Sequence, residues 1–237
     1  MSGPVGVYGG TFNPIHLGHL RAAEEVVETL GLARMLFVPS AEPPHKPAGT
    51  GHIAPASDRL TWAQLAVAGN PRFEVDPIEV ERRGPSYSVD TLRELGTRLA
   101  PELPVFTIGR DAFVEMGSWR EPEAIFTLAH IAVTTRPDID NTSPSAAKEA
   151  AHLAAWLPSC VRADIEVAAD GRSGRHRAAN TWIRLIEVTD LDISASDIRQ
   201  RIGTERSTRY LLPEAVREAV EKSGAYAASG DAHVESA

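Results

Sequence analysis

The stretch at residues 9–19 constrains the fold of this chain more than any other part of it. Its sequence is GGTFNPIHLGH, and it follows a short β-prone run at residues 5–8. Apolar residues then recur at helical spacing over residues 20–30. A strand, a glycine turn and a helix in this order predict a strand-to-helix crossover. At such a crossover glycines let a ligand approach the backbone, while the N-terminus of the helix attracts phosphate.

Two histidines at the start of the predicted helix add chemistry to this turn. His16 and His19 are three residues apart, which puts them on one side of the first helical turn. Their imidazole groups can donate hydrogen bonds to phosphate, and their charge can respond to it. A tight turn with two incidental histidines is the alternative interpretation, and the full pattern favours an anion site.

Strand-like and helical segments alternate along the first 137 residues. Further strands and helices are expected at the following segments: strands at residues 35–38, 73–80, 104–108 and 131–133, and helices at residues 57–69 and 88–99. This alternation predicts an α/β fold, a doubly wound parallel sheet with helices on both faces. A strand at residues 182–188 and helices that begin near residues 194 and 213 complete the expected fold.

A single domain over residues 1–222, followed by a tail, is the expected organisation of this 237-residue chain. The alternation breaks at residues 138–180, which are interpreted as an insertion. Three local patterns occur within it: helical spacing at residues 146–157, a strand-like run at residues 161–168 and a basic loop at residues 170–177. From residue 223 the chain is small and polar, so a disordered tail is expected over residues 223–237.

The composition excludes several classes of function. No window approaches the ~18–20 apolar residues of a membrane span, and a net charge of −8 argues against binding a nucleic acid polymer. The single cysteine, Cys160, cannot form an intramolecular disulfide, and the first residues lead directly into a strand without a signal peptide. A cytoplasmic protein with small-molecule partners is therefore expected. The sequence leaves the oligomeric state open, a homo-oligomer included.

Two cations lie where the predicted fold brings ligands. Lys46 belongs to a proline-rich loop at residues 39–55, over the carboxyl end of the sheet where ligands bind in open α/β folds. It is either a solvated surface lysine or a cation over the phosphate site. Arg199 lies near the start of a late helix, where Ser194 and Asp197 have capping-box-like spacing. That segment is either a well-capped helix or a second helix N-terminus that faces phosphate.

Three residues in the middle of the chain have both a structural and a functional interpretation. Ser88 either caps the helix at residues 88–99 or marks an anion-binding helix end. Asp111 comes just after a strand, where a carboxylate suits a ribose hydroxyl, and it is equally well placed to cap a helix. Trp119 lies in a polar stretch, so it is expected to be partly exposed, and it either packs in the core or stacks on a planar ligand.

The chain resembles the nucleotidyltransferase superfamily and, within it, the bacterial nicotinate-nucleotide adenylyltransferases, over roughly residues 4–222. The motifs that carry the resemblance occur in the family's order: GGTFNPIHLGH, VPSAEPPHK, PSYSVDTL, FTIGRDAF with Trp119 downstream, TTRP and ISASDIR. The first and last are common to the superfamily, and the middle ones select this member. The resemblance implies a Rossmann-like nucleotidyltransferase fold. It also implies transfer of the adenylyl group of ATP to nicotinate mononucleotide in NAD biosynthesis, giving deamido-NAD and pyrophosphate.

The resemblance also implies roles for individual residues. Contacts with phosphate during catalysis would come from His16, His19, Lys46 and Arg199. ATP would be bound by Gly9, Gly10, Thr11, Phe12, Gly109, Asp111, Ser194 and Ser196. Nicotinate mononucleotide would be bound by Ser88, Trp119, Arg120 and Arg136. Mg²⁺ would arrive on ATP, with no metal ligands expected from the chain.

The sequence departs from the family's pattern at one position and allows two alternative functions. Arg110 replaces the small residue common in the family, which predicts either a surface ion pair or an altered adenosine rim. An enzyme that accepts nicotinamide mononucleotide, alone or in addition, is the nearest rival. A nucleotide-sensing module without turnover is the second, although a sensor has no need of His16, His19 and the two cations together.

Overall fold

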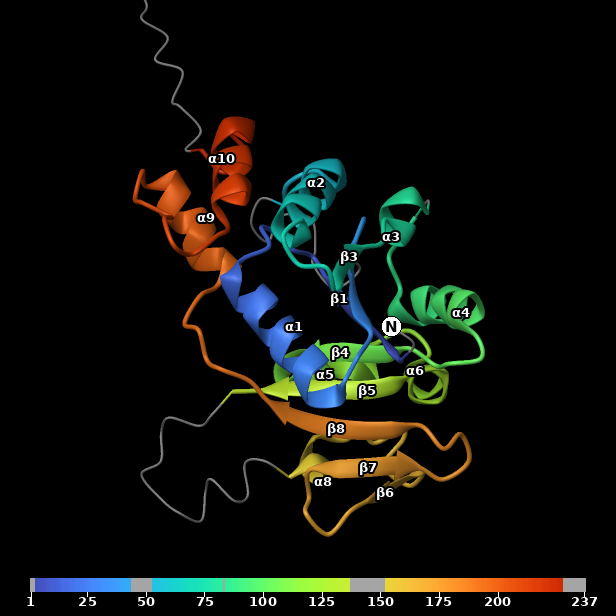
Figure 1. The fold of residues 1–237 in the computed structure, drawn as a ribbon. Helices are drawn as coiled ribbons and strands as arrows, with labels where there is room; N and C mark the ends of the chain where they lie inside the picture. The colour runs from blue at the N-terminus through green and yellow to red at the C-terminus, as the bar shows by residue number, and fades with distance from the viewer. Residues whose placement is uncertain (1–2, 44–52, 83, 137–151, 228–237) are drawn as a thin grey trace, which may run out of the picture.

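The computed structural model describes residues 3–43, 53–82, 84–136 and 152–227. Strands in these residues form one eight-stranded sheet in the order β3-β2-β1-β4-β5-β8-β7-β6 (Figure 1). They are β1 (Val5–Gly10), β2 (Arg34–Pro39), β3 (Phe73–Val75), β4 (Val105–Gly109), β5 (His130–Thr135), β6 (Ile165–Val167), β7 (Ser173–His176) and β8 (Trp182–Glu187). The strands from β3 to β8 in this order are parallel to their neighbours. The predicted doubly wound parallel sheet is confirmed for this part.

The other edge of the sheet differs from the prediction. β7 pairs antiparallel with β8, and β6 pairs antiparallel with β7, so the complete sheet is mixed. The basic residues 170–177, predicted as a loop, contain β7. That prediction is wrong because the charge of Arg175 lies on the exposed face while Gly174 and His176 are buried, which is the alternation of a strand.

Helices cover both faces of the sheet, as predicted (Figure 1). They are α1 (Leu17–Leu30), α2 (Ala56–Val67), α3 (Ile78–Glu81), α4 (Ser88–Leu99), α5 (Arg110–Glu115), the short 3₁₀ helix η1 (Met116–Ser118), α6 (Pro122–Leu128), α8 (Leu153–Trp156), α9 (Ala195–Gly203) and α10 (Glu214–Ser223). The apolar side chains of β2 point to both faces of the sheet, so both faces are covered by helices. Met35 and Phe37 pack in one core with α1, α2 and α10, whereas Leu36 and Val38 pack in a second core with α4 and α6.

Two predicted elements differ in extent. The strand expected at residues 73–80 ends at Val75 and is followed by α3. Pro77 has no N–H for a strand ladder, and the Asp76 carboxylate accepts the N–H of Ile78 at 3.0 Å, which favours a turn. Of the helix expected at residues 146–157, only α8 falls within the described residues.

The predicted disordered tail begins too early. Ser223 is the last residue of α10, and Tyr226 beyond it is only 7% exposed. The prediction is therefore wrong for residues 223–227, because burial of this tyrosine depends on contacts with distant parts of the chain. Residues 228–237 lie outside the described residues.

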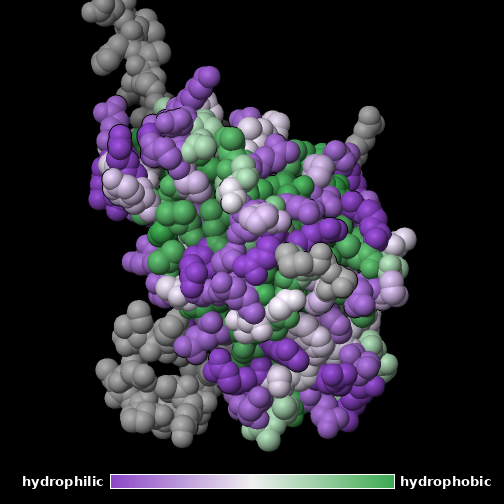
Figure 2. Space-filling model, viewed as in Figure 1, coloured by the Kyte–Doolittle hydropathy of each residue, from purple (hydrophilic) through white to green (hydrophobic). Residues whose placement is uncertain are grey.

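None of the helices in the described ranges is long and apolar enough to cross a bilayer. On the face shown in Figure 2, hydrophobic residues reach the surface between hydrophilic ones.

Candidate active site

The turn between β1 and α1 lies at the point where the strand order reverses. β1 pairs with β2 on one side and with β4 on the other, and in open α/β sheets ligands bind beyond the carboxyl ends of two such strands. Phe12 has a φ of 44° and is buried in this turn, where its ring lies 5.2 Å from that of His19. A Cβ at Gly10 would lie 2.9 Å from the Phe12 ring, so the turn closes only with glycine there.

The two histidines lie against each other at the start of α1. Their ring centroids are 3.7 Å apart and nearly parallel, and the backbone N–H of His16, the N-cap residue, donates to Nδ1 of His19 at 3.2 Å. Because Nδ1 of His19 accepts this bond, the proton of its neutral imidazole lies on Nε2. A Cβ at Gly18 would lie 3.1 Å from Nδ1 of His16, so a larger residue at that position would press on the imidazole.

Burial decides the charge of His16. Its side chain is 7% exposed, and this desolvation, together with the charge of Arg136, lowers its pKa to about 4. His16 is therefore neutral near pH 7 in this structure. Its Nδ1 is a buried polar atom with no hydrogen-bond partner among the described residues, which is a costly arrangement that a ligand could relieve.

A cleft of about 760 Å³, which we call the histidine cleft, is lined by both histidines and by some of the residues predicted to bind ATP, whereas Gly9, Gly10 and Thr11 line another cavity. Site residues in its walls are His16, His19, Gly109, Asp111, Arg136 and Ser194. They come from the start of α1, the ends of β4 and β5, and the start of α9. The lining combines cationic and neutral polar groups, which suit phosphate, with apolar side chains and with the carboxylates of Asp111 and Asp190.

Arg199 reaches the same turn from another side. It lies with Ser196 and Tyr226 in a neighbouring hollow of about 600 Å³ and donates to the carbonyl of Asn13 at 2.8 Å and to Ser196 Oγ at 3.2 Å. The predicted cap of α9 is confirmed, since Ser194 Oγ accepts the N–H of Asp197 at 3.1 Å. The structure therefore joins Arg199 to the turn before His16 but puts it in a different hollow.

A second cavity of about 310 Å³, the tryptophan pocket, adjoins the histidine cleft. Ser88, Trp119 and Arg120 line it together with the strand end at Gly9, Gly10 and Thr11. Trp119 is partly exposed, as predicted, and meets the Phe106 ring edge-on. Tyr8 and Gly109 belong to the walls of both cavities, so ligands in the two would meet at this point.

The positions of Arg136 and Ser88 differ from those expected from the sequence. Arg136 lines the histidine cleft, 3.3 Å from Asp190, and is not brought to Ser88, Trp119 and Arg120, because β5 ends on the far side of Gly109. Ser88 is the first residue of α4, and Tyr87 is its N-cap; what Ser88 offers is a backbone N–H of the first turn.

The cap of α5 also differs from the prediction. The N-cap is Gly109, and Asp111 lies inside the helix with its side chain 94% exposed. The surface ion pair predicted for Arg110 is confirmed, since its Nε lies 3.6 Å from the Asp111 carboxylate. Lys46, by contrast, lies outside the described residues and stays a prediction.

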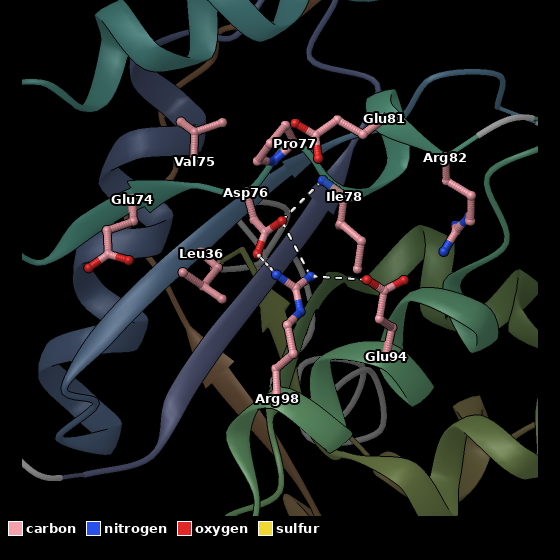
Figure 3. Close-up of a pocket in the computed structure, with 10 residues that line it drawn as sticks. All are labelled: Leu36, Glu74, Val75, Asp76, Pro77, Ile78, Glu81, Arg82, Glu94 and Arg98. Atoms are coloured by element: carbon pink, nitrogen blue, oxygen red, sulfur yellow. Dashed lines mark hydrogen bonds and ion pairs between the residues drawn. The ribbon is translucent and has the colours of Figure 1, made fainter.

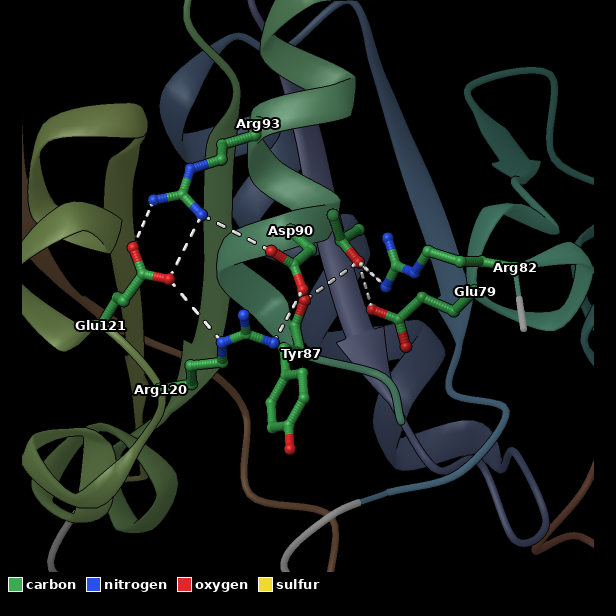
Figure 4. A network of polar contacts seen from close by, with 8 residues as sticks. Glu79, Arg82, Tyr87, Asp90, Arg93, Arg120 and Glu121 are labelled. Carbon is green, nitrogen blue, oxygen red and sulfur yellow. Dashed lines mark hydrogen bonds and ion pairs between the residues drawn. The ribbon is translucent and has the colours of Figure 1, made fainter. Parts of the chain in front are cut away.

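A network of ion pairs lies on the rim of the tryptophan pocket (Figure 4). The Arg120 guanidinium lies over the Tyr87 ring, at 4.7 Å, and pairs with Asp90 at 3.5 Å and with Glu121 at 3.7 Å. Arg93 joins the same two carboxylates. The network ties the start of α4 to the segment that carries Trp119.

Two buried charged residues were missed by the sequence interpretation. Arg59 of α2 is 1% exposed and donates to four carbonyl oxygens, those of Thr11, Ser40, Ala41 and Ala54, at 2.6–3.0 Å. Glu79 lines the tryptophan pocket and accepts from Thr91 Oγ1 at 2.6 Å, and burial raises its pKa. For Arg59 the signal was available: it shares the buried face of α2 with Trp62, Ala63 and Val67.

A further hollow of about 480 Å³ lies beside α3 and α4, away from the predicted site residues (Figure 3). Its main charges pair with each other, since Arg98 lies 3.1 Å from Asp76 and 3.7 Å from Glu94. Across the described ranges, no three His, Cys, Asp or Glu side chains are grouped to hold a metal ion.

Known proteins are similar to this chain in sequence. The cytidylyltransferase-like family matches residues 7–201. A probable nicotinate-nucleotide adenylyltransferase of Trichlorobacter lovleyi is 41% identical over 222 residues, covering 94% of this chain and 98% of the relative. Its counterpart in Geobacter sulfurreducens is 41% identical over 225 residues, covering 95% and 99%.

The fold is similar to a solved structure at much lower identity. The Plasmodium falciparum nicotinic acid mononucleotide adenylyltransferase complexed with NaAD has a TM-score of 0.65 at 14% identity, covering 95% of this chain and 98% of that one. At this identity the similarity concerns the fold alone. With the matches over nearly the full length of its relatives, the chain belongs to the nicotinate-nucleotide adenylyltransferase family of cytidylyltransferase-like proteins.

Proposed function

We propose that this protein transfers the adenylyl group of ATP to nicotinate mononucleotide, giving deamido-NAD and pyrophosphate in NAD biosynthesis. The observation that carries the proposal is the pair of adjoining cavities at the switch point of the sheet. One has histidines suited to phosphate, and the other has an indole suited to a planar ring. A reaction that joins two nucleotides needs two such cavities that meet, here at Tyr8 and Gly109.

The adenylyl transfer requires no nucleophilic side chain. A 5′-phosphate oxygen of the mononucleotide attacks the α-phosphorus of ATP in line, forming the new P–O bond while the bond to pyrophosphate breaks. The work left to the protein is alignment and stabilisation of negative charge. Mg²⁺ enters as part of MgATP, bound mainly through phosphates and water. We also propose that the reaction takes place in the cytoplasm.

Each histidine has a distinct part in this proposal. His19 presents Nε2–H as a hydrogen-bond donor, since its Nδ1 is already used by the backbone N–H of His16. His16 is neutral before ATP binds, and a polyanion beside it would favour its protonated form. Because the two rings are stacked at 3.7 Å, the pair would carry one positive charge more readily than two.

Cations around the cleft would complete the phosphate site. Arg136 and Arg199 approach the turn from β5 and α9, and we propose that both meet phosphate groups, with Lys46 as a third cation from the loop at residues 39–55. For Arg136 this replaces the role on the nicotinate side. Gly109 and Asp111 would bind the adenosine, in a cleft whose rim carries the Arg110 ion pair.

The tryptophan pocket would determine which mononucleotide is bound as the acceptor. The nicotinate ring would stack on Trp119, and its carboxylate would accept from backbone N–H groups at Ser88 and Arg120. The positive end of α4 adds a favourable interaction with that carboxylate.

Release of pyrophosphate is the direct test. The protein is incubated with MgATP and either nicotinate mononucleotide, nicotinamide mononucleotide or no acceptor. We expect rapid release with the acid, slower release with the amide and none without an acceptor. Equal or faster turnover of the amide would contradict the acceptor assignment, and no release with either acceptor would contradict catalysis altogether.

A further inference from the structure

Tyr226 connects the C-terminal end of the described chain to the turn after β1. It lies three residues beyond α10, is 7% exposed and packs its ring 5.9 Å from that of Trp62 in α2. Its hydroxyl donates to Oδ1 of Asn13 at 2.5 Å, across 213 residues of sequence. Nothing in the chemistry proposed above uses this tyrosine.

Asn13 is the centre of these contacts. Its Oδ1 accepts the Tyr226 hydroxyl and also the N–H of Ala54 at 3.0 Å, and its side chain is buried. A carbonyl oxygen has two lone pairs, so the two bonds satisfy it. Without the hydroxyl this buried hydrogen bond is lost, which favours a shift of the turn that carries Asn13.

The backbone of Asn13 carries a second set of contacts. Its carbonyl oxygen accepts from Nη1 of Arg199 at 2.8 Å, and His16 follows three residues later. Arg59 donates to the carbonyl of Thr11 in the same turn and to that of Ala54, whose N–H donates to Asn13. A shift of Asn13 would therefore move both the start of α1 and the acceptor that orients Arg199.

The protonation state of Tyr226 suits a permanent donor. Burial raises the pKa of its hydroxyl above the ordinary range, an effect that the charges of Arg199 and Arg59 oppose only in part. The hydroxyl is therefore protonated near neutral pH and can donate to Asn13.

We propose that Tyr226 is a positioning residue of the phosphate site, which acts through Asn13 on the turn that carries His16 and on Arg199. The inference rests on the proposed function for its effect on catalysis. Its effect on the geometry of the turn does not depend on which substrates are used.

The test removes the hydroxyl and nothing else. Tyr226→Phe keeps the ring against Trp62, and the matched control Tyr210→Phe makes the same change on a tyrosine that is 84% exposed. We expect Tyr226→Phe to lower kcat for pyrophosphate release by about tenfold, since small displacements in aligned sites are costly. The thermal midpoint should fall by only a few degrees, as for the loss of one buried hydrogen bond. Tyr210→Phe should leave kcat unchanged.

A double-mutant cycle tests whether Tyr226 acts through Asn13. Asn13→Asp keeps an acceptor oxygen for both donors, so it should stay active and should still lose activity when Tyr226→Phe is added. Asn13→Ala removes the acceptor, and adding Tyr226→Phe to it should cause no further loss. Full additivity of the two losses would overturn the proposed route through Asn13.

Hydrogen exchange separates this inference from the proposed function. Without any substrate, amides of residues 11–16 should exchange faster in Tyr226→Phe than in the wild type or in Tyr210→Phe. Unchanged exchange there, with unchanged kcat in the folded variant, would show that Tyr226 only fills the core. An inactive wild type would refute the proposed function, while the exchange result would still decide the role of Tyr226 in the turn.

Discussion

The histidine cleft and the tryptophan pocket meet at one strand end but are built for different tasks. The cleft is the larger, about 760 Å³ against about 310 Å³, and holds a stacked histidine pair with Arg136 beside it. The pocket has an aromatic and aliphatic wall that includes Phe106 and Trp119, next to a helix N-terminus. Under the proposed function, stabilisation of charge and choice of acceptor belong to separate walls, so mutations should affect them separately.

The largest effect is expected from the cleft. His19→Ala should lower kcat by the equivalent of about 2–4 kcal/mol, the range for loss of one oriented donor to a developing charge. The ratio of activity with acid and amide acceptors should stay the same, because the pocket is untouched. Steady-state kinetics with both mononucleotides measures this, with exposed His152→Ala as the control. A folded His19→Ala with near-normal kcat would refute the role.

The pocket should govern the preference for the acid. Nicotinamide would leave one backbone N–H without an acceptor, at a cost of about 1–3 kcal/mol, and would lose a charge–dipole attraction of about 0.3–1 kcal/mol. We expect kcat/KM for the acid to exceed that for the amide by roughly ten- to a thousandfold.

Trp119→Ala sharpens this comparison. It should weaken both acceptors and leave their ratio largely intact, since stacking does not distinguish the substituents. If the wild type had nearly equal kcat/KM for the two mononucleotides, the assignment of this pocket to nicotinate would be contradicted.

A pH effect on stability should come from the cleft as well. The pKa of His16 is about 4 when folded, below the usual 6.5, so the unfolded chain binds the proton more readily. Its contribution to stability is complete above pH 6.5 and is lost as the pH falls from there towards 4.

Denaturation measures this effect. Between pH 7 and pH 5 we expect the free energy of unfolding to fall by on the order of 2 kcal/mol on account of His16. The fall should be smaller in His16→Gln, measured by urea denaturation at both pH values. An identical fall in the two proteins would show that His16 is not the group responsible.

The smallest effect is expected from the rim network. Asp90 and Arg120 are both about a third exposed or more, and exposed ion pairs contribute about 0–1 kcal/mol. Asp90→Asn should raise KM for nicotinate mononucleotide by less than about fivefold and should leave KM for ATP unchanged. A larger change in KM for ATP would mean that the two cavities are coupled through α4.

Local pattern was enough to predict the parts of the fold that depend on neighbouring residues. The crossover at residues 9–19, the cap of α9 by Ser194 and the partial exposure of Trp119 follow from spacing and residue type. β7 was not predicted, because its charged residues obscure the alternation of buried and exposed side chains. The strand predicted at residues 73–80 was too long, because Pro77 ends it.

Distant contacts could not be predicted in the same way. The place of Arg136 depends on the order of strands in the sheet, and the low pKa of His16 depends on how deeply the turn is buried. The hydrogen bond of Tyr226 to Asn13 spans nearly the whole chain and leaves no periodicity in the sequence. These are properties of packing, so they become visible only in three dimensions.

The sheet ends at both edges on its shortest strands. β3 and β6 have three residues each, and the middle residue of each is an exposed glutamate, Glu74 or Glu166. Edge strands can recruit the edges of other molecules, and short, charged edges discourage this. A second copy that approached either edge to extend the sheet would meet a carboxylate in the centre of a strand too short to repay its desolvation. The edge at β6 thus ends the sheet in the same way as the edge at β3 does, which opposes growth of the sheet into fibres.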